Sequence, residues 1–591
     1  MNPSQRVLAI ATTLLVVVTA TWLATVNRRD RKESPQAASV PRTALANNRQ
    51  RDIWDAEHTT FEIERRFGPA FLDALRRGDR QRLAAFASAD FHGNGLAATT
   101  SLEREHAGIH ERIRQRSPGQ DPPVGSRLTA DAIAGLLLST HGGFRDPVDF
   151  SLRVLQISRA PQPPRSWTAR VLLTSRGRSP AGQQRLVASE HAISGIIADG
   201  RQLGSSPWLT RWSLERIVER TGPAGLFQEI TAEWNLDSLP IADNWNLSPS
   251  DVLQYRFQLA VADFNRDGHL DLAVASLSNH PLLLAGKQGR GFQDVAAAVR
   301  LHRGQPRERL ENLAAAWIDY DNDGWPDLIL GDRLYHNQQG RRFIDATRES
   351  GLGFLPECMG CLVADYDADG RLDLYVIYQK PLGRKPSGQE QWINETDSGL
   401  PNQLWRNMGH GRFRDVTDTA HADGGRRHTH AGAWFFLDDD HFPDLYLAND
   451  FGHNVILRNR GDGSFDDVSE VTGANGFSTS MGVATGDLDN DGRTDIYVAN
   501  MYSKMGRRII AQVGEADYPP GIYRQIQGSC AGNRLYRGVA GSRFEEISQT
   551  AGVNAVGWAY APVLADFDND GRLDVYATTG FLSFDRTKPD G

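Results

Sequence analysis

One short acidic loop recurs through the second half of this chain and constrains its fold more than any other feature. Five copies have the form Asp-x-Asp/Asn-x-Asp-Gly-x-x-Asp, with oxygen-bearing side chains on alternate residues. Calcium binds six to eight oxygen ligands, and the Gly permits the sharp turn that gathers them. The pattern predicts about five Ca²⁺ sites, whose ligands are Asp263, Asn265, Asp267 and Asp271; Asp319, Asp321, Asp323 and Asp327; Asp365, Asp367, Asp369 and Asp373; Asp487, Asp489, Asp491 and Asp495; and Asp566, Asp568, Asp570 and Asp574.

The loop differs from an EF-hand at its twelfth position. An EF-hand carries a bidentate Glu there, whereas this chain carries apolar residues: Val274, Leu330, Val376, Val498 and Ala577. Short apolar runs of strand length flank each copy on both sides. Each loop is therefore predicted to be the turn of a β-hairpin.

A second signature lies between the loops and predicts a second hairpin. Leu334-Tyr-His-Asn337 is followed by Phe343, and Leu404-Trp-Arg-Asn407 is followed by Phe413, with Gly-containing turns between the two halves. Two hairpins make a four-stranded unit that repeats about every 50 residues, which is typical of a β-propeller. The last unit has only its first hairpin. We expect a strand at 227–231 to close it, giving six blades, or seven if a long insertion hides a further blade.

These loops and hairpins resemble the FG-GAP/VCBS repeat family and, within it, the cartilage acidic protein 1-like branch. The resemblance covers about residues 227–580. It implies an integrin-α-like β-propeller with Ca²⁺ in its blade loops. We therefore assign residues 221–591 to a propeller domain.

The fourth unit departs from the pattern. Phe436 stands where the first carboxylate is expected, and His441 replaces the Gly. A phenyl ring cannot ligate a cation, so we expect weak or absent calcium binding in this unit.

The N-terminal region predicts a membrane anchor. Residues 7–26 are apolar or small and uncharged, which is long enough for a membrane helix, so residues 1–32 are interpreted as a transmembrane signal anchor, with a cleaved signal peptide as the alternative. Arg28 and Arg29 follow the span, which by the positive-inside rule favours a cytoplasmic location. Calcium loops favour an extracytoplasmic, periplasmic or cell-surface location instead. Residues 33–57 are polar and read as a linker.

Residues 58–220 have predicted helices followed by strand-like runs, which favours an α+β domain. The order resembles the NTF2-like (SnoaL-like) cone fold, without a sharp motif. Some enzymes of that fold use Asp or His in the cone, and Asp90 and His92 are the candidates here.

Long insertions are expected at the end of the propeller opposite the calcium loops, where residues on a rigid scaffold often bind partners. Their candidate partner-binding residues are Trp392, His428, His430, Arg507, Arg508 and Tyr523. His428 and His430 also have the spacing of metal ligands, but no third ligand is identifiable. The net charge of −8 and the lack of a basic stripe argue against nucleic acid.

The sequence thus predicts a non-enzymatic binding or adhesion module for a protein or glycan. The alternative is an enzyme acting on sugar polymers or a small molecule, with its site in the cone or on the propeller loops. Cys358 and Cys361 are expected to be buried thiols or a local disulfide, since no second CxxC or following His provides a zinc or haem site.

Overall fold

The computed structural model describes residues 47–580 except 97–98, 107, 117–126, 160–165, 198–202, 206, 224–227, 240–256, 277–281, 289–290, 302–313, 354, 356–357, 380–398 and 519–520. The chain divides into two compact units. Unit 1 contains residues 36–229 together with 504–517, and unit 2 contains residues 230–503 and 518–591.

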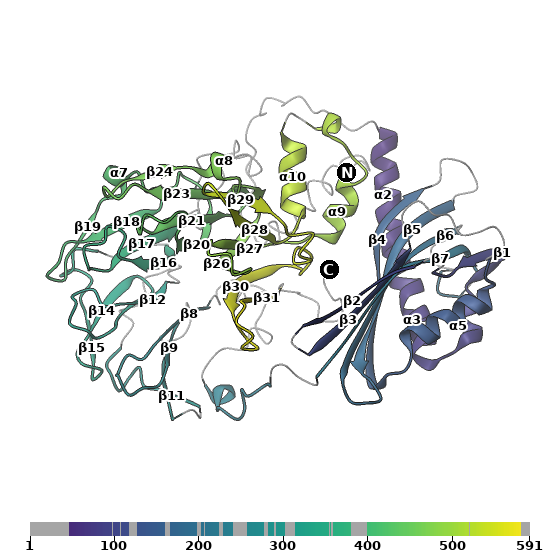
Figure 1. Ribbon diagram of the computed structural model, residues 1–591, viewed down its shortest axis with the longest axis horizontal. Helices are drawn as coiled ribbons and strands as arrows, with labels where there is room; N and C mark the ends of the chain where they lie inside the picture. The colour runs from purple at the N-terminus through teal and green to yellow at the C-terminus, as the bar shows by residue number, and fades with distance from the viewer. Residues whose placement is uncertain are drawn as a thin grey trace, which may run out of the picture. The chain divides into compact units, whose positions relative to one another are not determined.

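Unit 1 combines helices with a seven-stranded sheet (Figure 1). The strand order is β2-β3-β7-β6-β5-β4, all antiparallel, and β1 pairs with β7 in parallel. The helical elements are α2 (Asn47–Glu62), η1 (Ile63–Phe67), α3 (Gly68–Arg77), α4 (Arg80–Ala84), α5 (Ala130–His141), α9 (Lys504–Ile510) and η5 (Glu515–Asp517). The strands are β1 (Ala87–Asn94), β2 (Thr99–His106), β3 (Ile109–Arg116), β4 (Arg145–Arg159), β5 (Ser166–Arg178), β6 (Gln184–Ile196) and β7 (Leu209–Gly222).

Local sequence explains the helix ends in unit 1. Gly78 adopts a left-handed conformation that ends α3, and the Asp79 carboxylate then caps α4 by accepting a hydrogen bond from Arg82 N at 2.8 Å. The helices pack on one face of the sheet, where aromatic rings such as Phe71 and Trp212 stack with centroids 5.2 Å apart. The NTF2-like assignment of this unit stays a prediction.

Among the described residues, no helix has both the length and the apolar character needed to cross a membrane. The predicted anchor at residues 7–26 lies outside the described part of the chain.

A segment from far along the chain completes unit 1. Helix α9 contacts α2 and β4, and Arg508 from α9 makes two hydrogen bonds to the Glu57 carboxylate, at 2.8 and 3.2 Å. Arg508 also donates to the Val154 carbonyl at 3.1 Å and is only 8% exposed. Residues 504–517 therefore belong to unit 1, although the sequence places them inside the repeats.

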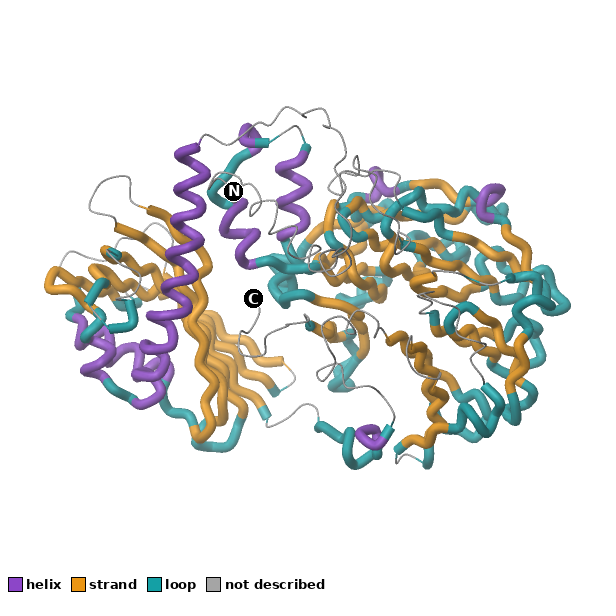
Figure 2. The backbone as a smooth tube through the Cα atoms, turned by 180° about the vertical axis from the view of Figure 1, so that it is seen from behind, coloured by secondary structure: helices purple, strands orange, loops and turns teal. Residues whose placement is uncertain are grey.

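Apart from one small strand pair described below, the described residues of unit 2 form a succession of antiparallel sheets, five with four strands and one with two (Figures 1 and 2). In chain order they are β8 (Phe257–Ala262), β9 (Asp271–Ser276), β10 (Leu282–Gly286) and β11 (Phe292–Asp294); β12 (Ala315–Ile318), β13 (Asp327–Leu330), β14 (Arg333–Asn337) and β15 (Phe343–Asp345); β16 (Cys358–Ala364), β17 (Asp373–Tyr378), β18 (Gln403–Asn407) and β19 (Phe413–Asp415); β20 (Thr429–Phe435), β21 (Asp444–Asn449), β23 (Val455–Asn459) and β24 (Phe465–Asp467); β26 (Ser480–Gly486), β27 (Asp495–Asn500), β28 (Arg534–Val539) and β29 (Arg543–Glu546); and β30 (Ala559–Ala565) with β31 (Asp574–Thr579).

Small elements connect these sheets. They are η3 (Leu236–Ser238), α7 (Thr417–Ala420), α8 (Ser469–Thr472), α10 (Ile522–Cys530) and the paired strands β22 (Gly452–His453) and β25 (Phe477–Ser478). The first strands contact one another in order, from β8 through β12, β16, β20 and β26 to β30. Apolar clusters fill the spaces between neighbouring sheets, which is the packing expected for a propeller-like array.

The strand expected at 227–231 to complete the last sheet is not found. Residues 228–231 form no strand, and β30–β31 has no third strand among the described residues. The segment that follows instead packs on the first sheet, where Trp234 contacts Phe292 with ring centroids 5.7 Å apart.

A buried Asn at the end of the third strand fastens each of three sheets to the preceding one. Asn407 donates to the Tyr320 carbonyl of the preceding sheet at 2.8 Å and to Leu372 O of its own sheet at 3.1 Å. Asn337 and Asn459 make the equivalent pairs of bonds. A buried carbonyl left without a donor is costly, so these amides fix the spacing between sheets.

We predict that Asn407→Ala lowers the free energy of unfolding by about 1–3 kcal/mol, because it leaves two buried carbonyls without a donor. Chemical denaturation measures the change. Arg414→Ala, an exposed position on the adjacent strand, serves as the control and should stay within about 0.5 kcal/mol of wild type. Equal effects of the two substitutions would contradict a fastening role for Asn407.

Candidate metal centres in the repeat loops

The five intact loops share one set of backbone hydrogen bonds. In the second loop, Asp319 Oδ1 accepts from Asp323 N at 3.1 Å, and Oδ2 accepts from Gly324 N at 2.9 Å. The corresponding bonds form at Asp263, Asp365, Asp487 and Asp566. The Gly has a positive φ in every intact copy, for example 84° at Gly324. The Asp-Gly spacing is thus explained by the turn itself as well as by ligation.

In the five four-stranded sheets, the Asp that ends the loop is buried and holds three segments together. Asp327 is 0% exposed, and it accepts from Asn337 N in the third strand at 2.6 Å and from Tyr320 N in the loop at 3.3 Å. Asp271, Asp373, Asp444 and Asp495 make the same two kinds of bond. This Asp therefore has a structural role that the sequence did not reveal.

Burial, together with the charges of neighbouring carboxylates, raises the pKa of the Asp that ends three of the loops. Burial, with the nearby Asp321 and Asp323 charges, raises the pKa of Asp327 to about 8. The same causes raise the pKa of Asp373 to about 7 and that of Asp271 to about 6. A divalent cation would favour the charged form of these groups.

Four of the five intact loops bring at least three carboxylates within 4.8 Å of one another. The groups are Asp319, Asp321 and Asp323; Asp365, Asp367 and Asp373; Asp487, Asp489 and Asp495; and Asp566, Asp568 and Asp574. In the first loop, the Asp267 amide bonds to both Asp263 and Asn265, so these predicted ligands also converge. Asp369, Asp491 and Asp570 accept hydrogen bonds from the backbone two residues later.

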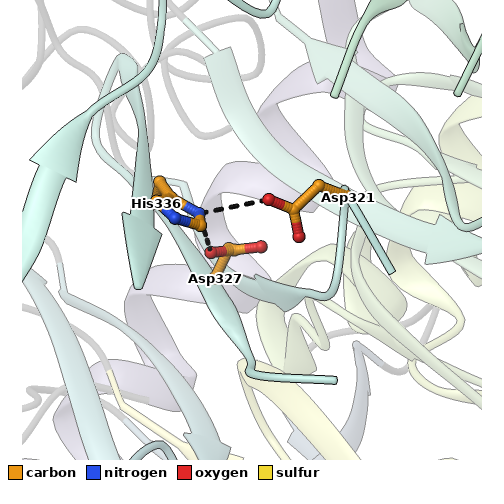
Figure 3. A group of neighbouring side chains, drawn as sticks. All are labelled: Asp321, Asp327 and His336. Atoms are coloured by element: carbon orange, nitrogen blue, oxygen red, sulfur yellow. Dashed lines mark ion pairs between the residues drawn. The ribbon is translucent and has the colours of Figure 1, made fainter. Parts of the chain in front are cut away.

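A side chain from the third strand reaches the loop in three sheets, which sequence reasoning missed. Arg406 lies 2.6 Å from Asp367 and 3.2 Å from Asp369, and Arg458 lies 2.7 Å from Asp438. In the second sheet the same position is His336, whose Nδ1 lies 3.3 Å from Asp321 and 3.2 Å from Asp327 (Figure 3). The residue before the Asn of the Leu-Tyr-x-Asn signature is the one that makes this contact, so the sequence did contain a signal for it.

The fourth loop keeps its structural Asp but not its first ligand. Phe436 is 54% exposed, and His441 takes the glycine position with a φ of 69°. Asp444 still bonds to Leu437 N and Asn459 N. The fourth loop therefore keeps the hydrogen bonds of Asp444 that hold the strands together, although it has lost the first predicted ligand.

An aromatic residue in the second position ties three loops to the next sheet. Phe264 contacts Phe343, Tyr320 contacts Phe413, and Tyr366 contacts Phe465, with centroids 5.8, 6.2 and 5.8 Å apart. The conformation of each of these loops is therefore coupled to packing between sheets.

The structure places the predicted partner-binding residues in different settings. Arg508 was expected to be exposed, and this is wrong, because it is buried against Glu57. Arg507 is exposed on α9 of unit 1, whereas Tyr523 lies on α10 of unit 2, its ring 6.2 Å from that of Tyr518. His428 and His430 flank the buried Thr429 at the start of β20. Trp392 lies outside the described residues.

The residues offered for an enzyme in unit 1 both lie on β1. Asp90 is exposed and accepts from Ser88 Oγ at 2.6 Å, and this hydrogen bond, with a smaller contribution from the charge of His92, lowers the pKa of Asp90. Two other histidines are buried in a chain that runs from Trp212 through His191, Ser189 and His141 to Ser175. Burial lowers the pKa of His141 to about 3. Both rings are only 1% exposed, so they fit a structural role.

The cysteine prediction is resolved in favour of thiols. Cys358 and Cys361, both on β16, are free in the structure and form no disulfide.

Comparison with known proteins agrees with the repeat assignment. A model of the FG-GAP-like repeat matches residues 263–330, 319–376, 437–498 and 526–577. The chain carries FG-GAP-like repeats. It is 29% identical over 354 residues to cartilage acidic protein 1 of Homo sapiens and 23% identical over 355 residues to that of Xenopus tropicalis. Each match covers 55% of this chain and 48% of the relative, so the chain spans about half the length of the curated relatives it matches.

Among solved structures, a mutant of AofleA from Arthrobotrys oligospora is 11% identical, with 78% of this chain and 86% of that chain covered. The TM-score is 0.21, which is too low to support any argument about fold or function.

We predict that, without a bound cation, unit 2 loses stability as the pH rises. The pKa values of Asp373 and Asp327 are raised to about 7 and 8, against about 3.9 in the unfolded chain. The folded state therefore binds more protons, and stability present near pH 4 is lost progressively up to about pH 8.

The measurement is the melting temperature of chelator-treated protein between pH 6 and 8. Asp373→Asn mimics the neutral carboxyl and should reduce the loss over this range. The buried histidines of unit 1 change stability with pH in the opposite direction. Subtracting the melting temperature of the wild type from that of the variant at each pH removes their contribution. An identical slope for both proteins would show that Asp373 does not titrate in this range.

Proposed function

We propose that this protein is a calcium-stabilised, extracytoplasmic binding module that is not an enzyme. The observation that carries the proposal is the repeated convergence of carboxylates in loops that also hold the sheets together. The FG-GAP-like repeats and the similarity to cartilage acidic protein 1 support it. In this proposal the sheets of unit 2 are the blades of a six-bladed propeller, anchored to a membrane by residues 7–26.

Calcium fits the chemistry of these loops. Asp and Asn oxygens and the backbone of a tight turn supply hard ligands, and Ca²⁺ tolerates irregular coordination. Bound cations would also favour the ionised forms of Asp327 and Asp373, whose pKa values are raised by burial and by neighbouring carboxylate charges. About five ions per chain are proposed, with none in the fourth loop.

The proposed partner is a protein or a glycan that binds the end of unit 2 opposite the calcium loops. His428, His430 and Tyr523 remain candidates because they lie at the ends of strands or in insertions on that side. Aromatic side chains are enriched in interface hot spots. Arg508 is removed from this set because Glu57 and Val154 already occupy its guanidinium.

Calcium should stabilise the fold through the intact loops but not the fourth one. We predict that chelation lowers the melting temperature, and that Asp489→Ala reduces calcium stoichiometry by one, because Asp489 lies in a converged carboxylate group. Asp438→Ala is the matched control, since Asp438 pairs with Arg458. Calorimetric titration gives both stoichiometries. Equal losses of calcium in the two variants would contradict the assignment, and an unchanged melting curve for verified metal-free protein would refute calcium stabilisation.

Partner capture should depend on the face opposite the loops. We predict that the combined substitution of His428, His430 and Tyr523 by Ala reduces binding to arrayed glycans and secreted proteins at least tenfold, with little change in melting temperature. Arg341→Ala, an exposed change at the calcium-loop end, is the control and should bind normally. A partner whose footprint maps to the calcium loops would overturn this orientation.

A further inference from the structure

We propose that the second loop holds a transition-metal dication such as Zn²⁺, through His336 Nδ1, Asp321 and Asp327. This inference rests on the proposed metal-binding role of the loops, but it assigns one of the five a different class of ion, which leaves four loops for calcium. It does not depend on any partner of unit 2.

The first argument is convergence. His336 Nδ1 lies 3.3 Å from a carboxylate oxygen of Asp321 and 3.2 Å from one of Asp327, and the three side chains point toward one another (Figure 3). Zinc binds His nitrogen and carboxylate oxygen at about 2.0–2.2 Å, so two ligands of a tetrahedral ion stand about 3.3 Å apart. The observed separations are those of ligands around one ion.

The second argument is the state of the ring nitrogen. Nδ1 is buried and makes no hydrogen bond of acceptable geometry, although two carboxylates are near it. In the neutral ring with the proton on Nε2, the lone pair of Nδ1 faces two carboxyl groups, which can only accept hydrogen bonds once both are ionised. A cation between the three atoms would relieve that conflict.

The third argument is that, among the five four-stranded sheets that the structure describes, only this one has a metal ligand in this position. When the sheets are aligned by the pairing of their third and fourth strands, the position of His336 is occupied in the other four-stranded sheets by Ala285, Arg406, Arg458 and Arg537. An arginine places its own charge against the carboxylates and cannot ligate a metal. Alanine offers no ligand. The second loop therefore differs from the others in chemistry while sharing their backbone.

The donor set favours a borderline metal over calcium. Imidazole suits Zn²⁺ and its neighbours in the first transition series, whereas Ca²⁺ selects oxygen. Asp327 is already fixed by Asn337 N and Tyr320 N, so one ligand is held in place before any ion arrives. Asp319 and Asp323 lie in the same loop and remain available to complete the shell.

Cobalt, which substitutes for zinc and absorbs visible light, provides the test. We expect chelator-treated full-length protein, kept in excess calcium, to bind one equivalent of Co²⁺ with absorption bands that Zn²⁺ abolishes. His336→Gln should weaken this binding at least tenfold. His336→Arg, which copies the residue of three other sheets, should abolish it while leaving circular dichroism and melting in calcium unchanged.

A gain of binding keeps the test independent of any folding defect. Arg406→His places an imidazole beside Asp367 and Asp373 and should add a second cobalt equivalent. In wild type, cobalt should also produce a hyperfine-shifted imidazole N–H signal in the proton NMR spectrum, and His336→Gln should remove it.

Three results would overturn the proposal: cobalt binding unchanged in His336→Gln, no cobalt equivalent in excess calcium, or an NMR spectrum showing His336 as an imidazolium paired with the carboxylates only. Calcium stoichiometry is measured separately. Loss of calcium binding with cobalt binding intact would refute the proposed function and leave this site standing, and the converse result would do the opposite.

Discussion

The structure of unit 2 depends on one buried carboxylate in each four-stranded sheet. The Asp that ends each acidic loop begins the second strand, accepts a hydrogen bond from the loop, and in the four-stranded sheets accepts another from the third strand. It therefore fixes where the loop ends, where the strand begins and how the third strand is aligned. A buried carboxylate needs such partners, because burying it without them is costly. The fourth loop separates this structural role from metal binding, because it retains Asp444 and its hydrogen bonds although Phe436 replaces the first predicted ligand.

Two contacts connect each of these loops to the next sheet. The residue after the first loop Asp contributes an aromatic ring to the following sheet, as with Tyr320 and Phe413. Its backbone carbonyl accepts the buried amide of Asn407 from that sheet. Binding of a cation in one loop is therefore coupled to the interface with its neighbour. The loops therefore join neighbouring sheets through hydrogen bonds and ring contacts, in addition to the apolar clusters between the sheets.

The sequence predicted the periodic part of the fold well, because its information is local. The carboxylate spacing and the apolar strands located the hairpins of unit 2, and the substitutions at Phe436 and His441 identified the exceptional loop. The sequence could not predict contacts between distant segments. Arg508 reaches Glu57 across 451 residues, and nothing in the composition of the insertion distinguishes a buried arginine from an exposed one. Predicting that His336 lies against Asp321 requires the strand register, because a shift of one residue would turn the His336 side chain to the other face of the sheet.

The loops differ most in how the charge of the carboxylates is balanced. In the third sheet Arg406 lies against Asp367 and Asp369, and in the fourth Arg458 lies against Asp438, so part of the charge is already compensated by the chain. In the first sheet Ala285 provides no such compensation, and in the second His336 provides a ring that can take either a proton or a metal. Because a fixed cation competes with a diffusible one for the same oxygens, affinity for calcium should vary from loop to loop although the backbone is nearly constant. The position equivalent to His336 in the third strand, which has no part in the acidic motif itself, is therefore where the four-stranded sheets differ most in the charge they present to their loops.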